Sequence, residues 1–208
     1  MLGGRRPLVR LSDAATSVAC VTRVIYYTAT TLDGYLADPD DSLDWLFAVE
    51  GGEGGGEAFE RFLDGIGVLV EGSTTYEWML RHEDLLAHPQ KWTELYGDRP
   101  TFVFTSRDLP LVPGADVRLV SGNVADAWTE IAAAAGDRAV WILGGGDLVG
   151  QFADAGLLDE VRVSVAPATL GAGKPLLPRR IGSDRLRLAS AEAAGQFAEL
   201  VYTVGGRA

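Results

Sequence analysis

The chain has 208 residues, of which 47% are apolar, and it carries a formal net charge of −11 at pH 7. This length predicts one domain with a sizeable core, and the acidic net charge argues against nucleic acid as a partner, since phosphate binding needs clustered lysines and arginines. A single cysteine, Cys20, excludes a disulfide framework, and no apolar run approaches the ~20 residues of a membrane span, so we expect a soluble, cytoplasmic protein.

Residues 1–21 differ from the rest of the chain in charge. They contain three arginines against one acid, Asp13. They lack the continuous apolar core of a secretory signal. We therefore interpret residues 1–21 as a flexible tail or an over-long assigned start, and residues 22–206 as a single domain.

The first predicted strand is Arg23–Thr31, which is rich in β-branched and aromatic residues. An Asp-Gly turn at Asp33 and Gly34 follows it. The segment Leu43–Phe47 then has the composition of a short helix. After a glycine-rich stretch, the i, i+3, i+4, i+7 spacing of four apolar residues predicts an amphipathic helix that contains Phe59, Phe62, Leu63 and Ile66.

Two glycine turns each connect a buried strand to a helix. Val68–Glu71 is an apolar strand, and Thr74 and Glu77 form a T-x-x-E capping box in the helix that follows. Val140–Leu143 is a second buried strand, which leads through Gly144–Gly146 into another helix. Glycines leave room for a ligand on the backbone, and free N–H groups at a helix start attract phosphate. An ordinary tight connection is the alternative, and the triplet does not match the G-x-G-x-x-G fingerprint.

The segment between these turns predicts two strands and two helices. Strands are expected at Thr101–Thr105 and Val117–Val120. A helix over Pro89–Gly97 would turn Trp92 and Leu95 inward. The helix after the second strand has Asn123 as its N-cap and Gly136 as its stop, and its inner face contains Val124, Ala127, Trp128 and Ile131.

The C-terminal part of the sequence follows a different pattern. Val161–Val165 alternates apolar and polar residues, as a half-exposed strand does, and Gly171–Pro178 predicts a loop. Leu186–Ala193 and Phe197–Val204 flank Gly195 as a hairpin. These patterns predict a three-layer α/β fold: a mainly parallel central sheet with helices on both faces and an antiparallel C-terminal hairpin.

Ligands bind beyond the carboxyl ends of the strands in such a sheet. Four segments are expected there, namely Asp33–Tyr35, Gly72–Thr75, Thr105–Arg107 and Gly144–Leu148. The two helix starts could hold a diphosphate, and Ser106 with Arg107 could hold one further phosphate. A dinucleotide with a 2′-phosphate fits this distribution better than a mononucleotide, although Arg107 could also be a plain surface arginine.

Two carboxylates, Asp33 and Asp44, have chain positions that bring them toward this pocket. A partly buried carboxyl group has a raised pKa and could donate a proton near neutral pH. The alternatives are a turn residue for Asp33 and a first-turn helix residue for Asp44. Tyr35, Trp45 and Tyr76 could contact a flat heterocycle, although aromatic residues at such positions are also typical of a core. No metal site is predicted.

Five motifs carry a resemblance: TATTLDGYLA (Thr28–Ala37), SLDWL (Ser42–Leu46), GSTTYE (Gly72–Glu77), FTSR (Phe104–Arg107) and LGGGDLVGQF (Leu143–Phe152). With them the chain resembles the dihydrofolate reductase-like superfamily over about residues 24–204. It is more closely similar to the reductase domain of the bacterial bifunctional riboflavin biosynthesis deaminase-reductase.

The resemblance implies an NADPH-dependent reductase, usually a homodimer, that acts on 5-amino-6-(5-phosphoribosylamino)uracil. The segment Glu77–Leu86 departs from that reductase, which carries paired acids and an arginine there, around a phosphorylated ribose. A dihydrofolate or pterin reductase and a non-catalytic nucleotide-binding module are therefore the alternatives. By this resemblance the cofactor would contact Gly72, Ser73, Thr74, Thr75, Thr105, Ser106, Arg107, Leu143, Gly144, Gly145, Gly146, Asp147 and Leu148.

Overall fold

The computed structural model describes residues 22–52 and 56–206, so the expectation of an N-terminal tail lies outside the described residues. Eight strands form one sheet: β1 (Val24–Thr31), β3 (Ile66–Gly72), β4 (Thr101–Phe104), β5 (Val117–Val120), β6 (Ala139–Gly144), β7 (Glu160–Ala166), β9 (Leu186–Ala194) and β10 (Phe197–Val204). Two short strands, β2 (Tyr35–Ala37) and β8 (Lys174–Pro175), pair separately in antiparallel fashion.

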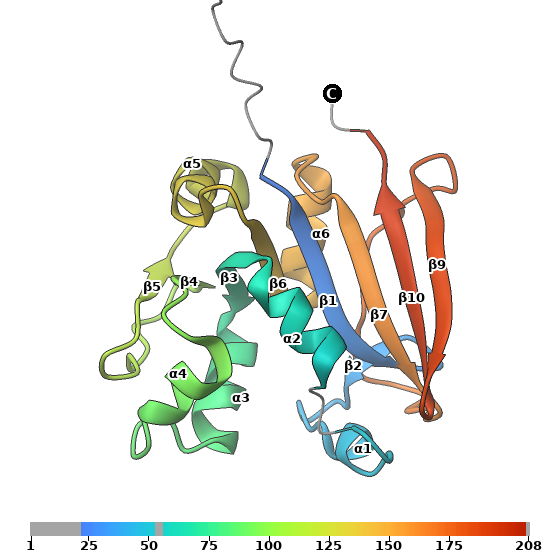
Figure 1. Ribbon diagram of the computed structural model, residues 1–208, viewed down its shortest axis with the longest axis horizontal. Coiled ribbons are helices and arrows are strands. Elements are labelled where there is room, and N and C mark those ends of the chain that lie inside the picture. Colours follow the sequence, from blue (N-terminus) through green and yellow to red (C-terminus); the bar gives the residue numbers. More distant parts are fainter. Residues whose placement is uncertain (1–21, 53–55, 207–208) are drawn as a thin grey trace, which may run out of the picture.

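The strand order in the large sheet is β5-β4-β3-β6-β1-β7-β10-β9, which runs from left to right in Figure 1. The first six strands in this order are parallel, and β10 and β9 add an antiparallel hairpin at one edge. The predicted mixture of parallel and antiparallel strands is therefore confirmed. The chain begins its sheet in the middle, because β1 pairs with β6 on one side and with β7 on the other.

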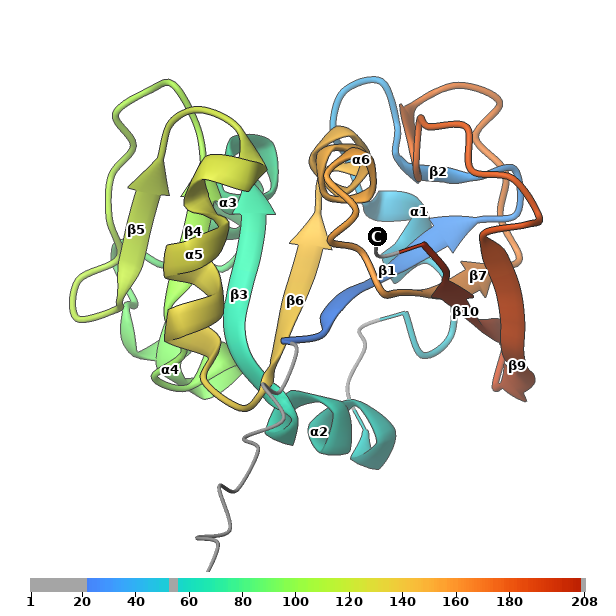
Figure 2. The same cartoon turned by 90° about the horizontal axis from the view of Figure 1, so that it is seen from above.

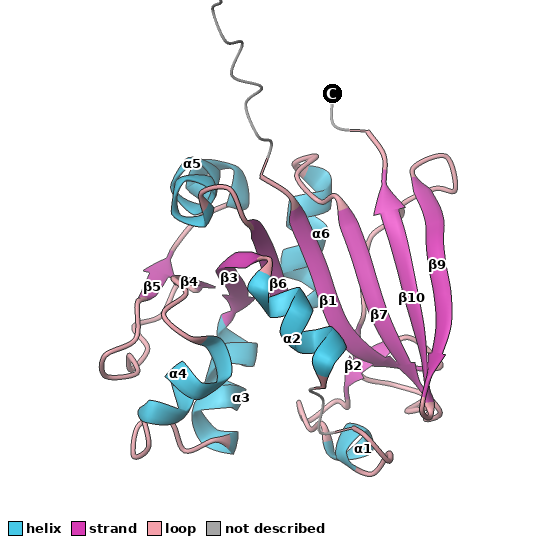
Figure 3. Ribbon diagram, viewed as in Figure 1, coloured by secondary structure: helices cyan, strands magenta, loops and turns pink. Residues whose placement is uncertain are grey.

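The described part of the chain has six helices: α1 (Asp44–Phe47), α2 (Glu57–Asp64), α3 (Ser73–His82), α4 (Gln90–Tyr96), α5 (Val124–Ala135) and α6 (Gly146–Asp154). Helices α5 and α6 pack on one face, and α2, α3 and α4 pack on the other (Figures 2 and 3). The predicted three-layer α/β fold is confirmed. No helix in the described part of the chain is long and apolar enough to cross a bilayer.

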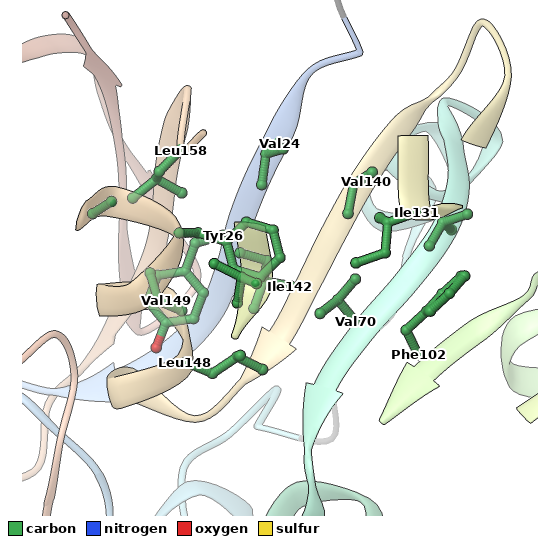
Figure 4. Packing of buried hydrophobic residues seen from close by; sticks show 14 of the residues in the cluster. Val24, Tyr26, Val70, Phe102, Ile131, Val140, Ile142, Leu148, Val149 and Leu158 are labelled. Carbon is green, nitrogen blue, oxygen red and sulfur yellow. The ribbon is translucent and has the colours of Figure 1, made fainter. Parts of the chain in front are cut away.

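Alternation along the central strands builds a separate hydrophobic core on each face of the sheet. On β1, Val24 and Tyr26 belong to the core under α5 and α6, whereas Ile25 belongs to the core under α2–α4. Figure 4 shows the first of these cores, where Leu148 and Val149 of α6 approach Tyr26 of β1. The first turn of α6 is thereby anchored at the point where β1 and β6 lie side by side.

Two details of the sequence interpretation are wrong. Ile66 is the first residue of β3 and not the last apolar position of the preceding helix, because α2 ends at Asp64 and Gly65 caps it. In α4, Leu95 is 38% exposed while Tyr96 is buried with Trp92. The inner face of this helix is therefore formed by Trp92 and Tyr96, which are four residues apart, and not by the expected pair of Trp92 and Leu95, which are three apart.

Candidate functional site

A cleft of about 400 Å³ lies beside the carboxyl ends of β1, β3 and β6. Its walls come from four parts of the chain: the end of β1, the segment 36–46, the first two turns of α3, and the connection from β6 to α6. The segment 174–178 adds a fifth wall. The cleft therefore forms where the topology gathers strand ends, which is where a ligand was expected.

The two predicted glycine turns meet in this cleft. Thr74 and Thr75 of α3 line it together with the stretch Leu143–Asp147. The two turns are also in direct contact, because a Cβ atom on Gly144 would lie 2.7 Å from Oγ1 of Thr75. Gly72 and Ser73 immediately precede the lining residues of α3. Segments 70 residues apart in the sequence thus form one continuous backbone surface.

Both helices that start at the cleft lack a side-chain cap. The N-cap residues of α3 and α6 are Gly72 and Gly145, and neither helix start receives a side-chain hydrogen bond. The predicted capping box of Thr74 and Glu77 is therefore wrong, because α3 already begins at Ser73. By contrast, α5 is capped by Asn123, whose side chain accepts from the N–H of Asp126. The first-turn N–H groups of α3 and α6 remain available to an anion.

The three glycines of the second turn have three different surroundings. Gly144 faces Thr75, and Gly145 has a φ of 90°, which side-chain-bearing residues rarely adopt. A Cβ atom on Gly146 would collide with the backbone carbonyl of Pro175. Close packing between chain segments therefore explains why positions 144 and 146 are glycines, in agreement with the alternative of an ordinary tight connection. Gly145 is the glycine that the backbone conformation requires.

Asp33 has a different environment from the one expected of a proton donor. Its carboxylate accepts hydrogen bonds from Thr31 Oγ1 at 2.5 Å and from the Gly171 N–H at 2.7 Å, and the Leu170 N–H also donates to it. The hydroxyl of Thr31 and these backbone groups lower the pKa of Asp33. Asp33 does not line the cleft. It ties the β1–β2 turn to the loop before β8, which is the turn role that was the alternative.

The short helix α1 contributes its aromatic residue to the cleft and not its acid. Trp45 lines the cleft, and its Nε1 donates to the carbonyl of Leu36 at 3.2 Å, which fixes the plane of the indole. Asp44 is exposed and is not among the lining residues. Adjacent residues on a helix point about 100° apart, so Trp45 can line the cleft while Asp44 is exposed.

Tyr76 is a core residue and does not contact the cleft. It is fully buried, its hydroxyl donates to the Pro110 carbonyl at 2.9 Å, and burial raises its pKa to about 12. The sequence interpretation of Tyr76 as a substrate contact is therefore wrong. Trp78, which was not predicted as a site residue, lines the cleft instead. Helical geometry gives the signal, because residues two apart on a helix face nearly opposite directions.

Two further predicted residues lie beside the cleft without lining it. Tyr35 is half-buried in β2, where it pairs with Pro175 of β8. The side chain of Leu148 is 6% exposed and belongs to the core beneath α6. A substrate contact by Tyr35 and a side-chain contact by Leu148 are therefore not supported, whereas the backbone N–H of Leu148 still belongs to the first turn of α6.

The segment Thr105–Arg107 follows β4 and lies outside the cleft lining. Thr105 Oγ1 accepts from the backbone N–H of Arg107 at 3.0 Å, and Ser106 is exposed. The guanidinium of Arg107 forms a bidentate ion pair with Glu77 of α3, at 3.1 and 2.5 Å. Arg107 is thus positioned next to α3 but already has an anionic partner, which the sequence did not indicate.

Two charged residues in the cleft were missed by the sequence analysis. Asp41 and Lys174 both line it, and their side chains form an ion pair of 3.4 Å. They are 133 residues apart, and Lys174 belongs to a strand of only two residues, β8, so no periodic pattern marks them. Among the described residues, no group of three or more histidine, cysteine, aspartate or glutamate side chains is arranged to hold a metal ion.

A larger hollow, of about 800 Å³, lies at the other end of the sheet. Trp128 of α5, the end of α6 and Arg185 line it. It gathers none of the predicted site residues, and it borders the amino end of β1, away from the strand ends where α/β sheets bind ligands. We therefore take the smaller cleft as the functional site.

Comparison with known proteins agrees with this fold. Residues 82–198 match the family described as the RibD C-terminal domain. The uncharacterized protein YwjB of Bacillus subtilis (strain 168) is 29% identical over 182 residues, which cover 86% of this chain and 97% of YwjB. A crystal structure of a candidate riboflavin biosynthesis protein from Shewanella sp. PV-4 is 24% identical, with a TM-score of 0.72, and the match covers 89% of this chain and 100% of that chain.

More distant structures share the same fold. One is the diaminohydroxyphosphoribosylaminopyrimidine deaminase/5-amino-6-(5-phosphoribosylamino)uracil reductase of Thermotoga maritima, with 15% identity, a TM-score of 0.61, and coverage of 88% of this chain and 57% of that chain. Another is the dihydrofolate reductase of Enterococcus faecalis complexed with NADP(H), with 14% identity, a TM-score of 0.54, and coverage of 88% and 97%. The predicted dihydrofolate reductase-like fold is confirmed. Because the family match spans more than half of its length, the chain belongs to the family of the RibD C-terminal domain.

Proposed function

We propose that the protein is an NADPH-dependent reductase that transfers hydride to a small, flat heterocyclic substrate. The observation that carries this proposal is the meeting of two uncapped helix starts, those of α3 and α6, in one cleft. Membership of the RibD C-terminal domain family supports it, as do the reductase named for the Thermotoga maritima structure and the NADP(H) bound to the Enterococcus faecalis protein.

The cofactor half of the proposal assigns backbone groups of the two turns to the diphosphate. The N–H groups of Ser73–Thr75 and of Gly146–Leu148 would hold it, and the Thr74 and Thr75 hydroxyls lie beside them in the cleft. Thr105, Ser106 and Arg107 would hold the 2′-phosphate. When bound, NADPH supplies the hydride, and the chain's own residues bind and orient the two reactants.

The substrate half of the proposal rests on the walls of the cleft. Trp45 and Trp78 line it, and indole rings offer flat apolar surfaces against which a heterocycle can pack, although one face of Trp78 already stacks on His82. The first candidate is 5-amino-6-(5-phosphoribosylamino)uracil, the substrate named for the Thermotoga maritima enzyme. Dihydrofolate and other pterins are the second group to be assayed.

The test measures NADPH binding and turnover separately. NADPH oxidation is followed at 340 nm with the aminouracil and with a panel of pterins, and NADPH binding is followed by calorimetry. The Gly145→Ala variant should bind NADPH at least ten-fold more weakly, because an alanine is strained at a φ of 90° and the turn must change shape.

Gly136→Ala is the matched control. It introduces the same kind of strain, at a φ of 63°, after α5 and away from the cleft. It should lower stability without changing NADPH affinity. Binding of NADPH without turnover of any candidate would replace the reductase proposal by a nucleotide-binding module, and absence of NADPH binding would overturn both.

We also propose that the protein forms a homodimer. The nine-residue strand β9 is an open edge of the sheet, and Leu188 on it is 57% exposed. Unpaired edge strands offer backbone groups to a second chain. Light scattering coupled to size-exclusion chromatography should give twice the chain mass of 22.1 kDa, whereas a single-chain mass at micromolar concentration would contradict the dimer.

A further inference from the structure

Lys174 is held at the cleft by a rigid backbone. It pairs with Ala37 in the β2–β8 ladder, and the next residue is Pro175, whose ring fixes φ. Gly173, just before it, packs so closely that a Cβ atom would collide with the carbonyl of Ala37. After it, the Leu176 N–H donates to the carbonyl of Gly34 at 2.9 Å. The lysine therefore starts from a fixed position on the cleft wall.

Lys174 brings a positive charge into the cleft of an acidic protein. Among the described residues that line the cleft, it is the only cation, and Asp41 and Asp147 are the anions. Asp147 is already engaged, because its carboxylate accepts from Gln151 at 3.1 Å and from Arg179 at 2.9 Å, and these two bonds lower its pKa. Asp41 is therefore the lining anion that interacts with Lys174.

The ion pair between Lys174 and Asp41 leaves the ammonium group accessible. Its N–O distance is 3.4 Å, longer than the roughly 2.7–2.9 Å of a strong charge-assisted hydrogen bond. The side chain of Lys174 is 47% exposed and that of Asp41 is 36% exposed. Solvent screens such pairs, so an incoming phosphate with several oxygen acceptors can displace the carboxylate.

We propose that Lys174 is a specificity-determining residue that binds a phosphate group of the substrate, and that Asp41 holds the ammonium group when no phosphate is bound. This inference rests on the proposed reductase function. A cofactor phosphate has the same chemistry, but Lys174 is paired with the segment 36–46, which also supplies Trp45 to the proposed substrate wall. The proposed cofactor turns come from α3 and α6.

The test uses ribose 5-phosphate and ribose as probes that differ in one anionic group. Their binding to the full chain is followed through tryptophan fluorescence, since Trp45 and Trp78 line the cleft, with and without NADPH. The wild-type protein should bind ribose 5-phosphate at least ten-fold more tightly than ribose. Lys174→Gln should abolish that preference and leave NADPH affinity within two-fold of the wild type.

The Asp41→Asn variant gives an effect of opposite sign. Asparagine tolerates the φ of 63° at this position, and the variant removes the carboxylate that competes for the ammonium group. Ribose 5-phosphate should then bind several-fold more tightly. If the ion pair had only a structural role, Lys174→Gln and Asp41→Asn would both weaken binding, and the proposal would be overturned.

Lys91→Gln is the matched control for loss of charge. Lys91 forms an ion pair with Glu83 at 3.2 Å and does not line the cleft, so this variant should behave as the wild type does. Equal losses of affinity for NADPH and for ribose 5-phosphate in Lys174→Gln would assign Lys174 to the cofactor and overturn the substrate role. The substrate role would also be overturned if the wild-type protein showed no preference for ribose 5-phosphate over ribose. Retention of that preference without NADPH turnover would overturn the reductase proposal alone.

Discussion

At the scale of single residues, the carboxyl group of Glu71 has the least favourable surroundings. Glu71 is fully buried at the end of β3, on the same face as Leu69, and neither carboxyl oxygen has a hydrogen-bond partner within the described residues. Tyr76 and Tyr96 are its titratable neighbours. Burial raises its pKa to about 8 from an ordinary value of 4.5. Glu71 is therefore neutral in the folded protein at neutral pH.

This shift predicts that stability falls as pH rises. Between the unfolded pKa of 4.5 and the folded pKa of about 8, the folded state keeps a proton that the unfolded state releases. As far as this group is concerned, the free energy of unfolding should therefore be largest below pH 4.5 and should decrease by on the order of a few kcal/mol by pH 8.

Urea denaturation of Glu71→Gln at pH 5 and pH 8 tests this prediction. The variant cannot ionise at this position, so its free energy of unfolding should change much less between the two pH values. Glu94→Gln, at an exposed position on α4, is the control and should keep the wild-type pH dependence. If the free energy of unfolding of Glu71→Gln depended on pH as strongly as that of the wild type, another group would be the cause of the pH dependence.

Arg107 and Glu77 make a second prediction at this scale. If Arg107 binds the 2′-phosphate, Arg107→Ala should weaken NADPH binding by roughly ten-fold or more, which is the loss expected for one charged hydrogen bond. The affinity for NADH should change little. Because Glu77 occupies the guanidinium in the present structure, Glu77→Gln should shift the preference further toward NADPH. The dissociation constants of both dinucleotides measure this preference. Equal losses of NADPH and NADH affinity in Arg107→Ala would show that Arg107 does not bind the 2′-phosphate.

At the scale of elements, the sequence predicted those whose signals are local. The predicted strand Val117–Val120 has the same bounds as β5, and the Asn123 cap of α5 was recognised from one side chain and the apolar spacing after it. The pairing of β2 with β8 was missed, because it joins segments about 140 residues apart and has three residues in one strand and two in the other. Such short strands have no periodicity of their own.

The contact between β3 and α5 gives a prediction about packing. A Cβ atom on Gly67 would collide with the carbonyl of Ala135 at the end of α5, whereas one on Gly65 would meet its nearest neighbour at 3.4 Å. Gly67→Ala must therefore push α5 away from the sheet, which costs about 1–3 kcal/mol in a well-packed core. Thermal unfolding should show a melting temperature lower by several degrees, with little change for Gly65→Ala. Equal effects would contradict the packing argument.

At the scale of the whole molecule, the strand ends could be assigned to one region before the structure was known, but the side chains there could not. The carboxyl ends of parallel strands lie at the same end of the sheet, so Thr74, Thr75 and the glycine triplet Gly144–Gly146 meet there as expected. Asp41 and Lys174 are brought to the cleft by tertiary packing, which no local pattern in the sequence specifies. The same limit explains why both a proton donor and a turn residue were left open for Asp33, since its partners Leu170 and Gly171 are far away in sequence.

The arrangement of the sheet predicts how the molecule unfolds. The pairing of β1 with β6 has three residue pairs, whereas β1 and β7 share seven, so the narrowest connection in the sheet lies between β1 and β6. The core under α5 and α6 spans this connection, because Leu148 and Val149 of α6 belong to the same cluster as Tyr26 and Ile142 (Figure 4). Shared apolar contacts couple the two halves of the sheet.

We therefore expect residues 22–206 to unfold as a single cooperative unit. Far-ultraviolet circular dichroism reports on all strands and helices, while the fluorescence of Trp92, Trp128 and Trp141 reports on both cores. The two urea transitions should coincide in midpoint and steepness. Phe152→Ala, which leaves a cavity in the core under α5 and α6, should destabilise the protein by about 3–5 kcal/mol. If the halves were independent, the variant would instead separate the transitions, because only one half would lose stability.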